Sequence, residues 1–255
     1  MADPHRPARV PCLILVGGFG IRLRSVISDL PKPMAPIAGK PFLEYLIRWV
    51  ARHGFEQFVL CGGYRAEAIT RHFGNGEQLG VQIEYSLETE PLGTWGAIRK
   101  AMGTSAGDYF LVFNGDSFLQ FEINYLVDFH IAKKALASLA VVQVADGSRF
   151  GSVRVSADGH IEEFCEKRTR GPVLINGGVY CLSRKVIQLV SETDSSLERD
   201  VFPRLIGQGL YGMRVQGEFF DIGVPEEYAR LAADSERWVS HLKLAPSRRP
   251  SADSF

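Results

Sequence analysis

The chain has 255 residues, of which 45% are hydrophobic, and its 29 basic residues balance 29 acidic ones, so the formal net charge is zero. This length allows one large domain or two small ones, and the hydrophobic content is ample for a buried core. The zero net charge argues against a nucleic-acid partner, whose binding favours a clustered basic surface. The sequence has no apolar run of about 18 residues, so no membrane span is expected.

The chain ends and the cysteines indicate a cytoplasmic protein. Residues 1–10 are expected to form a flexible N-terminus, and they lack the apolar core of a signal peptide. Residues 246–255, rich in Ser, Pro and Arg, are expected to form a disordered tail. No Cys-x-x-Cys pair occurs, so buried reduced thiols are expected rather than disulfides or zinc ligands. These cysteines are Cys12, Cys61, Cys165 and Cys181.

The first half of the chain alternates short apolar strands with helical patterns, which predicts an α/β sheet with crossover connections. The last of the strands is apolar throughout, as expected of a central strand covered on both faces. Strands are expected at Cys12–Val16, Phe58–Cys61, Val81–Ser86 and Tyr109–Phe113, and helices at Pro41–Arg52, Ala66–Phe73 and Thr94–Met102.

The second half is richer in strand patterns, and only short turns separate most of them. A hairpin is expected at Asp158-Gly159. Strands are expected at Ala137–Ala145, Ser152–Ser156, Ile161–Cys165, Val173–Cys181 and Met213–Phe220, and helices at Arg184–Val190, Leu197–Gln208 and Glu226–Leu242. No internal repeat is visible.

A glycine-rich segment follows the first strand directly. Gly17, Gly18 and Gly20 are followed by Arg22, and Lys32 lies between two prolines a little further on. Glycines let backbone N–H groups approach a polyanion closely, and the two cations neutralise phosphate charge. The segment alone is also compatible with an ordinary turn. It is neither a P-loop nor a dinucleotide fingerprint, because its spacing fits neither motif.

Two aspartates follow apolar strands, as ligand-binding side chains of such a sheet do. Asp116, in Asn114-Gly115-Asp116, follows the strand Tyr109–Phe113. We therefore expect it at the same sheet edge as the glycine loop. Asp221 follows the apolar residues Phe219 and Phe220. Either aspartate alone would be read as a turn residue.

The combined motifs resemble the sugar-1-phosphate nucleotidyltransferases. They are Gly-Gly-x-Gly-x-Arg-Leu from Gly17 and then Pro-Lys-Pro-Met-x-Pro-Ile-x-Gly-Lys-Pro-Phe from Pro31, and the similarity extends from Leu13 to about Tyr228. The resemblance implies a Rossmann-like three-layer α/β/α fold with a mixed, mainly parallel central sheet and a small β-rich sugar-binding insertion. It implies one domain over residues 11–245, with 11–120 mainly nucleotide-binding and 121–225 mainly sugar-binding.

The family's reaction is attack by a sugar 1-phosphate oxygen on the α-phosphorus of a nucleoside triphosphate, with pyrophosphate leaving. The nucleophile is already an anion at pH 7, so positioning and charge stabilisation carry most of the catalysis. The resemblance implies that Asp116 and Asp221 hold Mg²⁺, which favours one or two carboxylates completed by phosphates and waters. It also implies that Arg22 steadies the leaving phosphates and that Lys32 reaches the phosphates near the reacting centre.

The resemblance further assigns residues to both substrates. Lys167 matches a lysine that contacts the sugar phosphate, which makes Arg22, Lys32, Asp116 and Lys167 the implied catalytic set. The implied sugar-binding residues are Gly151, Glu166, Lys167 and Asn176. The implied nucleotide-binding residues are Leu15, Gly17, Gly18, Gly20, Arg22, Lys32, Glu88, Gly93 and Asn114.

The segment Glu88–Thr94 resembles the part of the family that reads the base. Guanine presents two adjacent donors, N1–H and the N2 amino group, and one carboxylate can accept both. Aligned from Gly93, Glu88 falls where a base-reading side chain is found in similar enzymes, and Glu90 is the competing candidate. A solvated acidic loop is the alternative reading of this segment.

Three segments look most like the branch of the family that transfers GMP to D-glycero-D-manno-heptose 1-phosphate for bacterial surface polysaccharide: Ser28–Ile37, Gly39–Leu46 and Phe220–Tyr228. This branch implies GTP and a sugar 1-phosphate as partners. Guanylyltransferases acting on mannose 1-phosphate are the nearest alternative, and a non-catalytic nucleotide-sugar sensor is another. Ile21 stands where the family usually has threonine. A homodimer is compatible with the sequence, but no residue pattern requires one.

Overall fold

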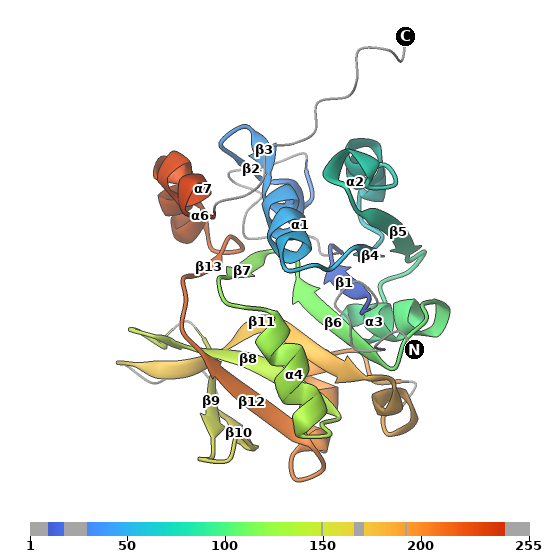
Figure 1. Ribbon diagram of the computed structural model, residues 1–255, viewed down its shortest axis with the longest axis vertical. Helices are drawn as coiled ribbons and strands as arrows, with labels where there is room; N and C mark the ends of the chain where they lie inside the picture. Colours follow the sequence, from blue (N-terminus) through green and yellow to red (C-terminus); the bar gives the residue numbers. More distant parts are fainter. Residues whose placement is uncertain (1–9, 18–29, 149, 166–170, 192, 243–255) are drawn as a thin grey trace.

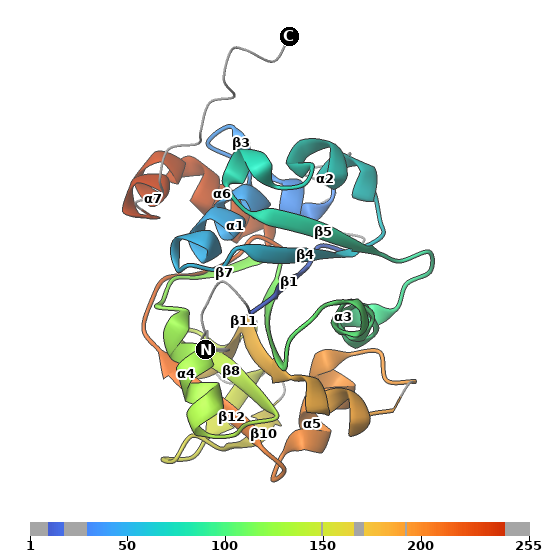
Figure 2. The same ribbon diagram turned by 45° about the vertical axis from the view of Figure 1, so that its right-hand side comes forward.

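The structure is a computed structural model, and it describes residues 10–17, 30–148, 150–165, 171–191 and 193–242. A central nine-stranded sheet runs through it in the order β10-β9-β11-β6-β1-β4-β5, with β8 paired to β11 and β12 paired to β8. Figures 1 and 2 show helices on both faces of this sheet. The expected mixed sheet of a Rossmann-like fold is therefore confirmed.

The first half of the chain builds the parallel part of the sheet. Its helices form the crossovers between parallel strands, as the alternating sequence pattern predicts. The strands are β1 (Cys12–Leu15), β4 (Gln57–Gly62), β5 (Gln82–Leu87) and β6 (Tyr109–Asn114), and the helical segments are α1 (Phe42–Arg52), α2 (Ala66–Phe73), the 3₁₀ turn η3 (Glu77–Leu79) and α3 (Gly93–Thr104).

The second half extends the sheet from the other side of β6. The long strand β11 (Val173–Ser183) runs antiparallel to β6 and also pairs with β8 and β9. The other elements here are α4 (Asn124–Ala132), β8 (Ala137–Val144), β9 (Ser152–Val155), β10 (Ile161–Cys165) and β12 (Leu210–Val215), which runs parallel to β8. The expected hairpin at Asp158-Gly159 joins β9 to β10.

The sheet separates two hydrophobic clusters, which makes the fold three-layered. Along β6, Leu111 and Phe113 face the cluster that includes α1 and α4, whereas Phe110 and Val112 face the cluster that includes α3. All four side chains are at most 2% exposed. This alternation explains why the strand is apolar throughout, since both of its faces are covered.

Two small two-stranded sheets flank the parallel part of the main sheet. One pairs β7 (Ser117–Leu119) with β13 (Phe219–Asp221), so that Asp221 lies opposite Ser117. The other pairs β2 (Pro36–Ile37) with β3 (Lys40–Pro41), just after the 3₁₀ turn η2 (Lys32–Met34). The helices α6 (Pro225–Ala233) and α7 (Ser235–Leu242) follow β13.

Four predictions of helices and strands are wrong in detail. The predicted helix over 197–208 is a π-helical turn, η5 (Leu197–Val201), followed by the short α5 (Phe202–Leu205), because Pro203 lacks an N–H and starts a new helix. The predicted helix at 184–190 is the 3₁₀ segment η4 (Arg184–Gln188). The predicted strand over 213–220 is divided between β12 and β13, and the predicted helix over 226–242 is interrupted at Asp234. The sequence analysis did not anticipate α4.

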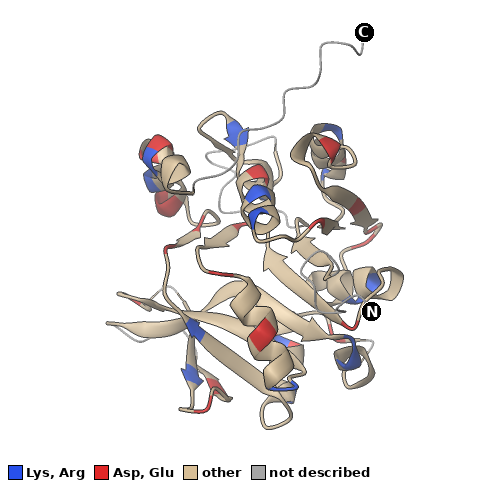
Figure 3. Ribbon diagram, viewed as in Figure 1, with Lys and Arg blue, Asp and Glu red and all other residues tan. Residues whose placement is uncertain are grey.

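Charged residues are of mixed sign over the described surface. Figure 3 shows Lys and Arg interspersed with Asp and Glu along the helices, while β1, β6 and β11 carry neither. Within the described ranges, no helix has the length and apolar character needed to cross a membrane.

Candidate active site

The ends of β1, β4, β5 and β6 meet at one edge of the sheet, where the expected ligand-binding loops begin. Leu15 at the end of β1 is in register with Asn114 at the end of β6, and with Cys61 on β4. As expected, Gly17, the part of the first loop that the structure describes, lies at the same edge as Asn114-Gly115-Asp116. The chain segments pack closely here: a Cβ on Gly115 would overlap the Leu15 carbonyl group.

Three neighbouring cavities lie along this edge, and together they are called the cleft. The first, of about 440 Å³, is named the base-side cavity after the role predicted for Glu88, and it shares Leu15 and Gly17 with the central cavity, of about 220 Å³. The third, of about 210 Å³, is named the metal-side cavity after the role predicted for Asp116 and Asp221, and it shares Asn114 and Asp116 with the central cavity. A ligand could therefore extend from the end of β5 past β1 and β6 to β11.

Asp116, Asp221 and Lys32 converge in the metal-side cavity. The Lys32 Nζ lies 3.3 Å from the Asp116 Oδ2. A Cβ built on Gly223 would lie 2.9 Å from the Asp221 Oδ1, 2.9 Å from the Lys32 Nζ and 3.4 Å from the Asp116 Oδ2. The missing side chain of Gly223 thus leaves the space in which two carboxylates and one ammonium group meet.

Pairing of β7 with β13 explains how two aspartates far apart in sequence become neighbours. Asp116 lies just before β7, and Asp221 ends β13 opposite Ser117. The backbone N–H of Ile222 donates to the Asp116 carbonyl oxygen at 2.9 Å. The Gly223 N–H donates to the Asp221 Oδ1, also at 2.9 Å, which fixes the orientation of that carboxylate.

This donor set fits a hard divalent cation that takes its remaining ligands from substrate. The carboxylates of Asp116 and Asp221 line one small cavity. Mg²⁺ is usually bound by one or two protein carboxylates, with water and phosphate oxygens as its other ligands. Among the described residues, no group of three or more His, Cys, Asp or Glu side chains could hold a metal without help. A metal here would therefore depend on phosphate oxygens and water for the rest of its coordination.

At the base-side cavity, Glu88 lies between the ends of β1 and α3. Its Oε2 accepts a hydrogen bond from the Leu92 N–H at 2.7 Å. Its Oε1 would be 3.2 Å from a Cβ on Gly17, so it lies close to the start of the segment that follows β1. Glu90 also lines this cavity and is exposed. The structure thus brings both candidate base readers to the same cavity.

Gly93 lines the same cavity, but its need for glycine has another cause. Its φ is +72°, in the left-handed region, and a Cβ would overlap the backbone carbonyl group of Ser195. The close packing therefore joins the start of α3 to the segment that precedes η5, whatever Gly93 contributes to a bound base.

The thiol of Cys61 also lines the base-side cavity. Burial, with a smaller contribution from the negative charge of Glu88, raises the pKa of Cys61 to about 12. The thiol is therefore protonated near neutral pH and is a poor nucleophile.

Asn176, which the sequence analysis predicts to bind the sugar, and Gly178, both of β11, line the metal-side cavity together with Phe150 and Phe219. The rings of Phe150 and Phe219 meet edge to face, with centroids 5.8 Å apart. Gly151 is exposed and lies beside the Cys165 carbonyl oxygen, 3.3 Å from where a Cβ would be.

Six residues named in the sequence analysis lie outside the described residues, and their roles stay predictions. These are Gly18, Gly20, Ile21, Arg22, Glu166 and Lys167. The described residues expected at the site all lie along the cleft or directly beside it in the chain: Leu15, Gly17, Lys32, Glu88, Gly93, Asn114, Gly151, Asn176, Asp116 and Asp221.

Glu198, whose carboxylate lines the central cavity, was not predicted from the sequence. Glu198 lies in the π-helical turn η5, where it is hydrogen-bonded to Thr94 at the start of α3. Tyr180, a fully buried tyrosine on β11 whose hydroxyl donates to the Glu198 carboxylate, was not predicted either. The regular helix expected over 197–208 gave no reason to direct Glu198 towards the cleft, and an apolar strand gives no signal for one buried hydroxyl.

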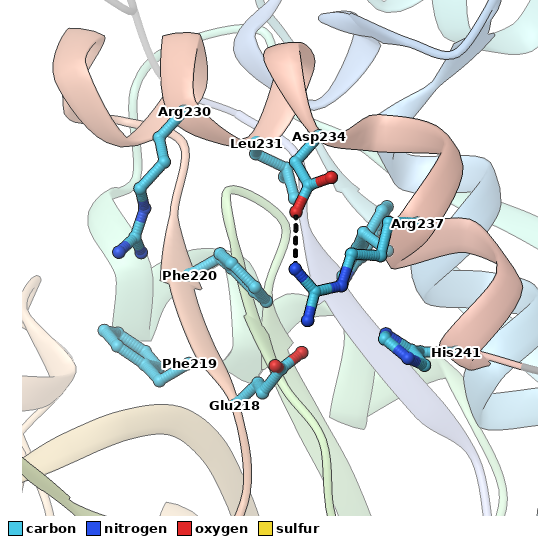
Figure 4. A pocket seen from close by; sticks show the side chains of 9 residues that line it. Glu218, Phe219, Phe220, Arg230, Leu231, Asp234, Arg237 and His241 are labelled. Atoms are coloured by element: carbon cyan, nitrogen blue, oxygen red, sulfur yellow. Dashed lines mark ion pairs between the residues drawn. The ribbon is translucent and has the colours of Figure 1, made fainter.

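A separate cavity of about 370 Å³ lies behind β13, against α6 and α7. Figure 4 shows Arg230 and Arg237 extending from these helices beside Phe219 and Glu218. Arg237 forms an ion pair with Asp234 at 3.7 Å. Phe219 lines this cavity as well as the metal-side cavity, so it forms part of the wall between them.

Comparison with known proteins agrees with this geometry. The sequence profile of the nucleotidyl transferase family matches residues 12–237. The chain therefore belongs to the nucleotidyl transferase family.

Two curated relatives and one solved structure are informative. A D-glycero-alpha-D-manno-heptose 1-phosphate guanylyltransferase from Aneurinibacillus thermoaerophilus is 37% identical over 229 residues, which are 89% of this chain and 99% of the relative. A mannose-1-phosphate guanylyltransferase from Mycobacterium tuberculosis is 38% identical over 237 residues, which are 91% of this chain but only 66% of that enzyme. HddC from Yersinia pseudotuberculosis, in a crystal structure complexed with GMP-PN, superposes with a TM-score of 0.79 at 31% identity, covering 89% of this chain and 99% of HddC.

Proposed function

We propose that this protein transfers GMP from GTP to a sugar 1-phosphate, with D-glycero-D-manno-heptose 1-phosphate as the acceptor, and releases pyrophosphate. The convergence of Lys32, Asp116 and Asp221 where the central cavity adjoins the metal-side cavity carries this proposal. Guanylyltransferases among its relatives support GTP as the donor.

In this reaction a phosphate oxygen of the sugar 1-phosphate forms a bond to the α-phosphorus of GTP. The bond between that phosphorus and the oxygen bridging to the β-phosphate breaks, and pyrophosphate leaves with the electron pair. The nucleophile is an anion already, so the protein needs no strong base; it must hold two polyanions in line and offset their repulsion. Lys32, on the turn η2, would supply one positive charge at this point.

Asp116 and Asp221 would hold the Mg²⁺ ion. When bound, the ion neutralises charge on the triphosphate and orients its phosphates. The β7–β13 pairing holds both carboxylates on rigid backbone, and Gly223 leaves them the space to meet. The protein thereby orients the phosphates before the reaction begins.

Glu88 would read guanine. Its Oε2 already accepts the Leu92 N–H, so its remaining lone pairs and its Oε1 would accept the two guanine donors, N1–H and N2–H. A base without that pair of donors would leave the carboxylate unpaired in the cavity, which costs binding energy. Glu90 remains the competing reader, because it lines the same cavity.

The two substrates are proposed to bind mainly to different halves of the chain. Residues 11–120 would mainly bind the nucleotide and residues 121–225 mainly the sugar, within one domain. The four cysteines are free thiols, which supports the proposed cytoplasmic location.

Heptose is proposed before mannose because Ser28–Ile37, Gly39–Leu46 and Phe220–Tyr228 resemble the heptose branch. Heptose 1-phosphate guanylyltransferases from two organisms, 37% and 36% identical to this chain, support that choice. A non-catalytic sensor is the second candidate, and Ile21 favours it, because isoleucine lacks the hydroxyl that the family usually has at this position. Retention of Lys32, Asp116 and Asp221 favours the enzyme.

The test is pyrophosphate release with Mg²⁺, in which GTP, UTP, dTTP, ATP and CTP are each combined with heptose, mannose and glucose 1-phosphates. Release with GTP and heptose 1-phosphate alone is the expected result. A preference for mannose 1-phosphate would keep the reaction and overturn the proposed acceptor. Release with UTP or dTTP at equal efficiency would overturn the proposed role of Glu88.

A further inference from the structure

Tyr180, on β11, has a hydroxyl group in which every hydrogen-bonding position is used. It accepts hydrogen bonds from the Asn176 Nδ2 at 2.9 Å and from the Asn114 Nδ2 at 3.4 Å. It donates its proton to the Glu198 Oε1 at 3.4 Å. A hydroxyl has one donor and two acceptor lone pairs, so this arrangement is complete.

The direction of these hydrogen bonds is fixed at both ends. The Asn176 Oδ1 accepts the Gly178 N–H at 2.9 Å, so the other end of that amide, the nitrogen, faces Tyr180. An ionised carboxylate such as Glu198 can only accept. Burial, and then the negative charge of Glu198, raise the pKa of Tyr180, so its hydroxyl keeps its proton throughout the neutral range.

A backbone irregularity brings these groups together. The pairing of β11 with β8 shifts register between Asn176 and Tyr180. Gly178, inside the shift, has a φ of +74°, and a Cβ there would be 3.2 Å from the Asn114 Nδ2. Such bulges are enriched beside active sites because they redirect side chains. Asn114 itself approaches β11 through the β6–β11 ladder, in which the preceding Phe113 pairs with Val179, and the missing Cβ of Gly178 leaves room for its side chain.

The same network continues towards the nucleotide side of the cleft. The Glu198 Oε2 accepts hydrogen bonds from the hydroxyls of Thr94 and Ser196, each at 3.4 Å. The Thr94 hydroxyl in turn accepts the Leu197 N–H at 2.8 Å. Thr94 lines both the base-side and central cavities, whereas Asn176 lines the metal-side cavity. Tyr180 therefore joins groups from the two ends of the cleft.

We propose that the Tyr180 hydroxyl is a positioning group for the transfer reaction, orienting Asn176 towards the sugar 1-phosphate and Asn114 and Glu198 towards the nucleotide. Its side chain is fully buried, so it acts through these three residues and does not touch substrate. The inference rests on the proposed function, because it assigns the two ends of the network to the two substrates.

Tyr180→Phe tests this with the loss of one oxygen atom. We expect the KM for the sugar 1-phosphate to rise about tenfold, the factor that corresponds to one net hydrogen bond. Tyr45→Phe is the matched control: Tyr45 is also buried, and its hydroxyl donates to the Ile37 carbonyl oxygen at 2.9 Å, away from the cleft. It should leave both KM values unchanged.

A double-mutant cycle separates positioning from a general structural effect. If Tyr180 acts through Asn176, the double variant should have a KM for the sugar 1-phosphate less than twofold higher than that of Asn176→Ala alone. A further tenfold rise would overturn the proposal, as would an unchanged sugar KM in Tyr180→Phe alone. Should Tyr180→Phe unfold, Glu198→Gln should raise the KM for GTP, and an unchanged value would count against the proposal. A wild-type chain without pyrophosphate release would instead refute the proposed function.

Discussion

The Lys32 ammonium group lies 3.3 Å from the Asp116 carboxylate, although one follows the first strand and the other follows β6. Their side chains are 22% and 37% exposed, so the pair faces the cleft and is partly screened by solvent. A pair this exposed contributes little to folding, which agrees with the proposed role of both residues in binding phosphates and a metal ion.

Asp116→Asn should separate turnover from nucleotide binding. The change keeps the shape of the side chain and removes the negative charge that a divalent ion needs, so we expect the kcat to fall roughly 10³-fold. GTP affinity measured by calorimetry without metal should change by less than about threefold. Asp128→Asn, on the exposed side of α4, is the control and should change neither quantity. Full activity in Asp116→Asn would exclude this residue as a metal ligand.

Gly223→Ala should lower activity without unfolding the protein. The new methyl group would lie 2.9 Å from both the Asp221 Oδ1 and the Lys32 Nζ and would push these groups apart. We expect kcat to fall about 100-fold, the scale of effect seen when catalytic groups move by about 1 Å. The φ of Gly223 is outside the left-handed region, so the backbone accepts alanine.

Gly103→Ala is its matched control. Gly103 lies in α3, and a Cβ there would have no atom within 4 Å. This variant should keep wild-type kinetics and unfold at an equal or higher temperature, because alanine favours helix by about 0.5–1 kcal/mol. Equal kinetics in the two glycine variants would contradict the account of the metal-side cavity.

Glu88→Gln should reduce selectivity for guanine. An amide presents one acceptor where the carboxylate presents two, so kcat/KM for GTP should fall about 10- to 100-fold. Glu90→Gln, in the same cavity, is the comparison and should change kcat/KM less than about threefold. The reverse outcome would transfer the base-reading role to Glu90.

His130 should make the protein less stable in acid. Burial lowers the pKa of His130 from its ordinary value of 6.5 to about 4, and its Nδ1 is 3.0 Å from the Ser138 hydroxyl. Between pH 6.5 and 4 the unfolded chain binds a proton that the folded chain does not. Stability is therefore complete above pH 6.5 and falls towards pH 4, by about 3 kcal/mol from this group.

The pH dependence of thermal unfolding in His130→Gln checks this assignment. Glutamine can still bond to Ser138 and does not titrate, so this variant should lose less stability than the wild type between pH 6.5 and 4. His160→Gln is the control, because the His160 side chain is 43% exposed. Identical pH profiles for wild type and His130→Gln would show that His130 does not contribute.

Ile21→Thr should improve the enzyme. A threonine hydroxyl would restore one possible hydrogen bond to a phosphate, which is worth about 1.5–3 kcal/mol with a charged partner. The KM for GTP should fall at least tenfold in steady-state kinetics. No gain in nucleotide affinity or rate would show that Ile21 does not limit this protein.

Much of the fold was predictable because its signals are local. The apolar stripe of α1 and the uninterrupted apolar strand β6 are each recognised within one segment, and their alternation with the neighbouring strands and helices predicts an α/β sheet. The π-helical turn at Leu197–Val201 was not predictable, because it depends on Pro203 and on hydrogen bonds to Thr94 on another element. The helix α4 has apolar residues around most of its surface, so it lacks a clear amphipathic stripe.

Part of the candidate site was also predictable, where the signal for a residue lies within its own segment. Asp116 and Asp221 could be selected because each follows an apolar strand, but their convergence depends on the β7–β13 pairing, which joins Ser117–Leu119 to the distant Phe219–Asp221. Tyr180 and Glu198 carry no sequence signal of this kind, because their importance lies in hydrogen bonds between distant elements.

The most direct test of the central claim is the mass of the product formed from GTP, Mg²⁺ and D-glycero-D-manno-heptose 1-phosphate, with Asp116→Asn run in parallel. We expect GDP-heptose and one equivalent of pyrophosphate from the wild-type chain, and roughly 10³-fold slower formation of both from Asp116→Asn. A wild-type chain that binds GTP but forms no nucleotide sugar, with heptose or with mannose 1-phosphate, would contradict the central claim and favour the sensor.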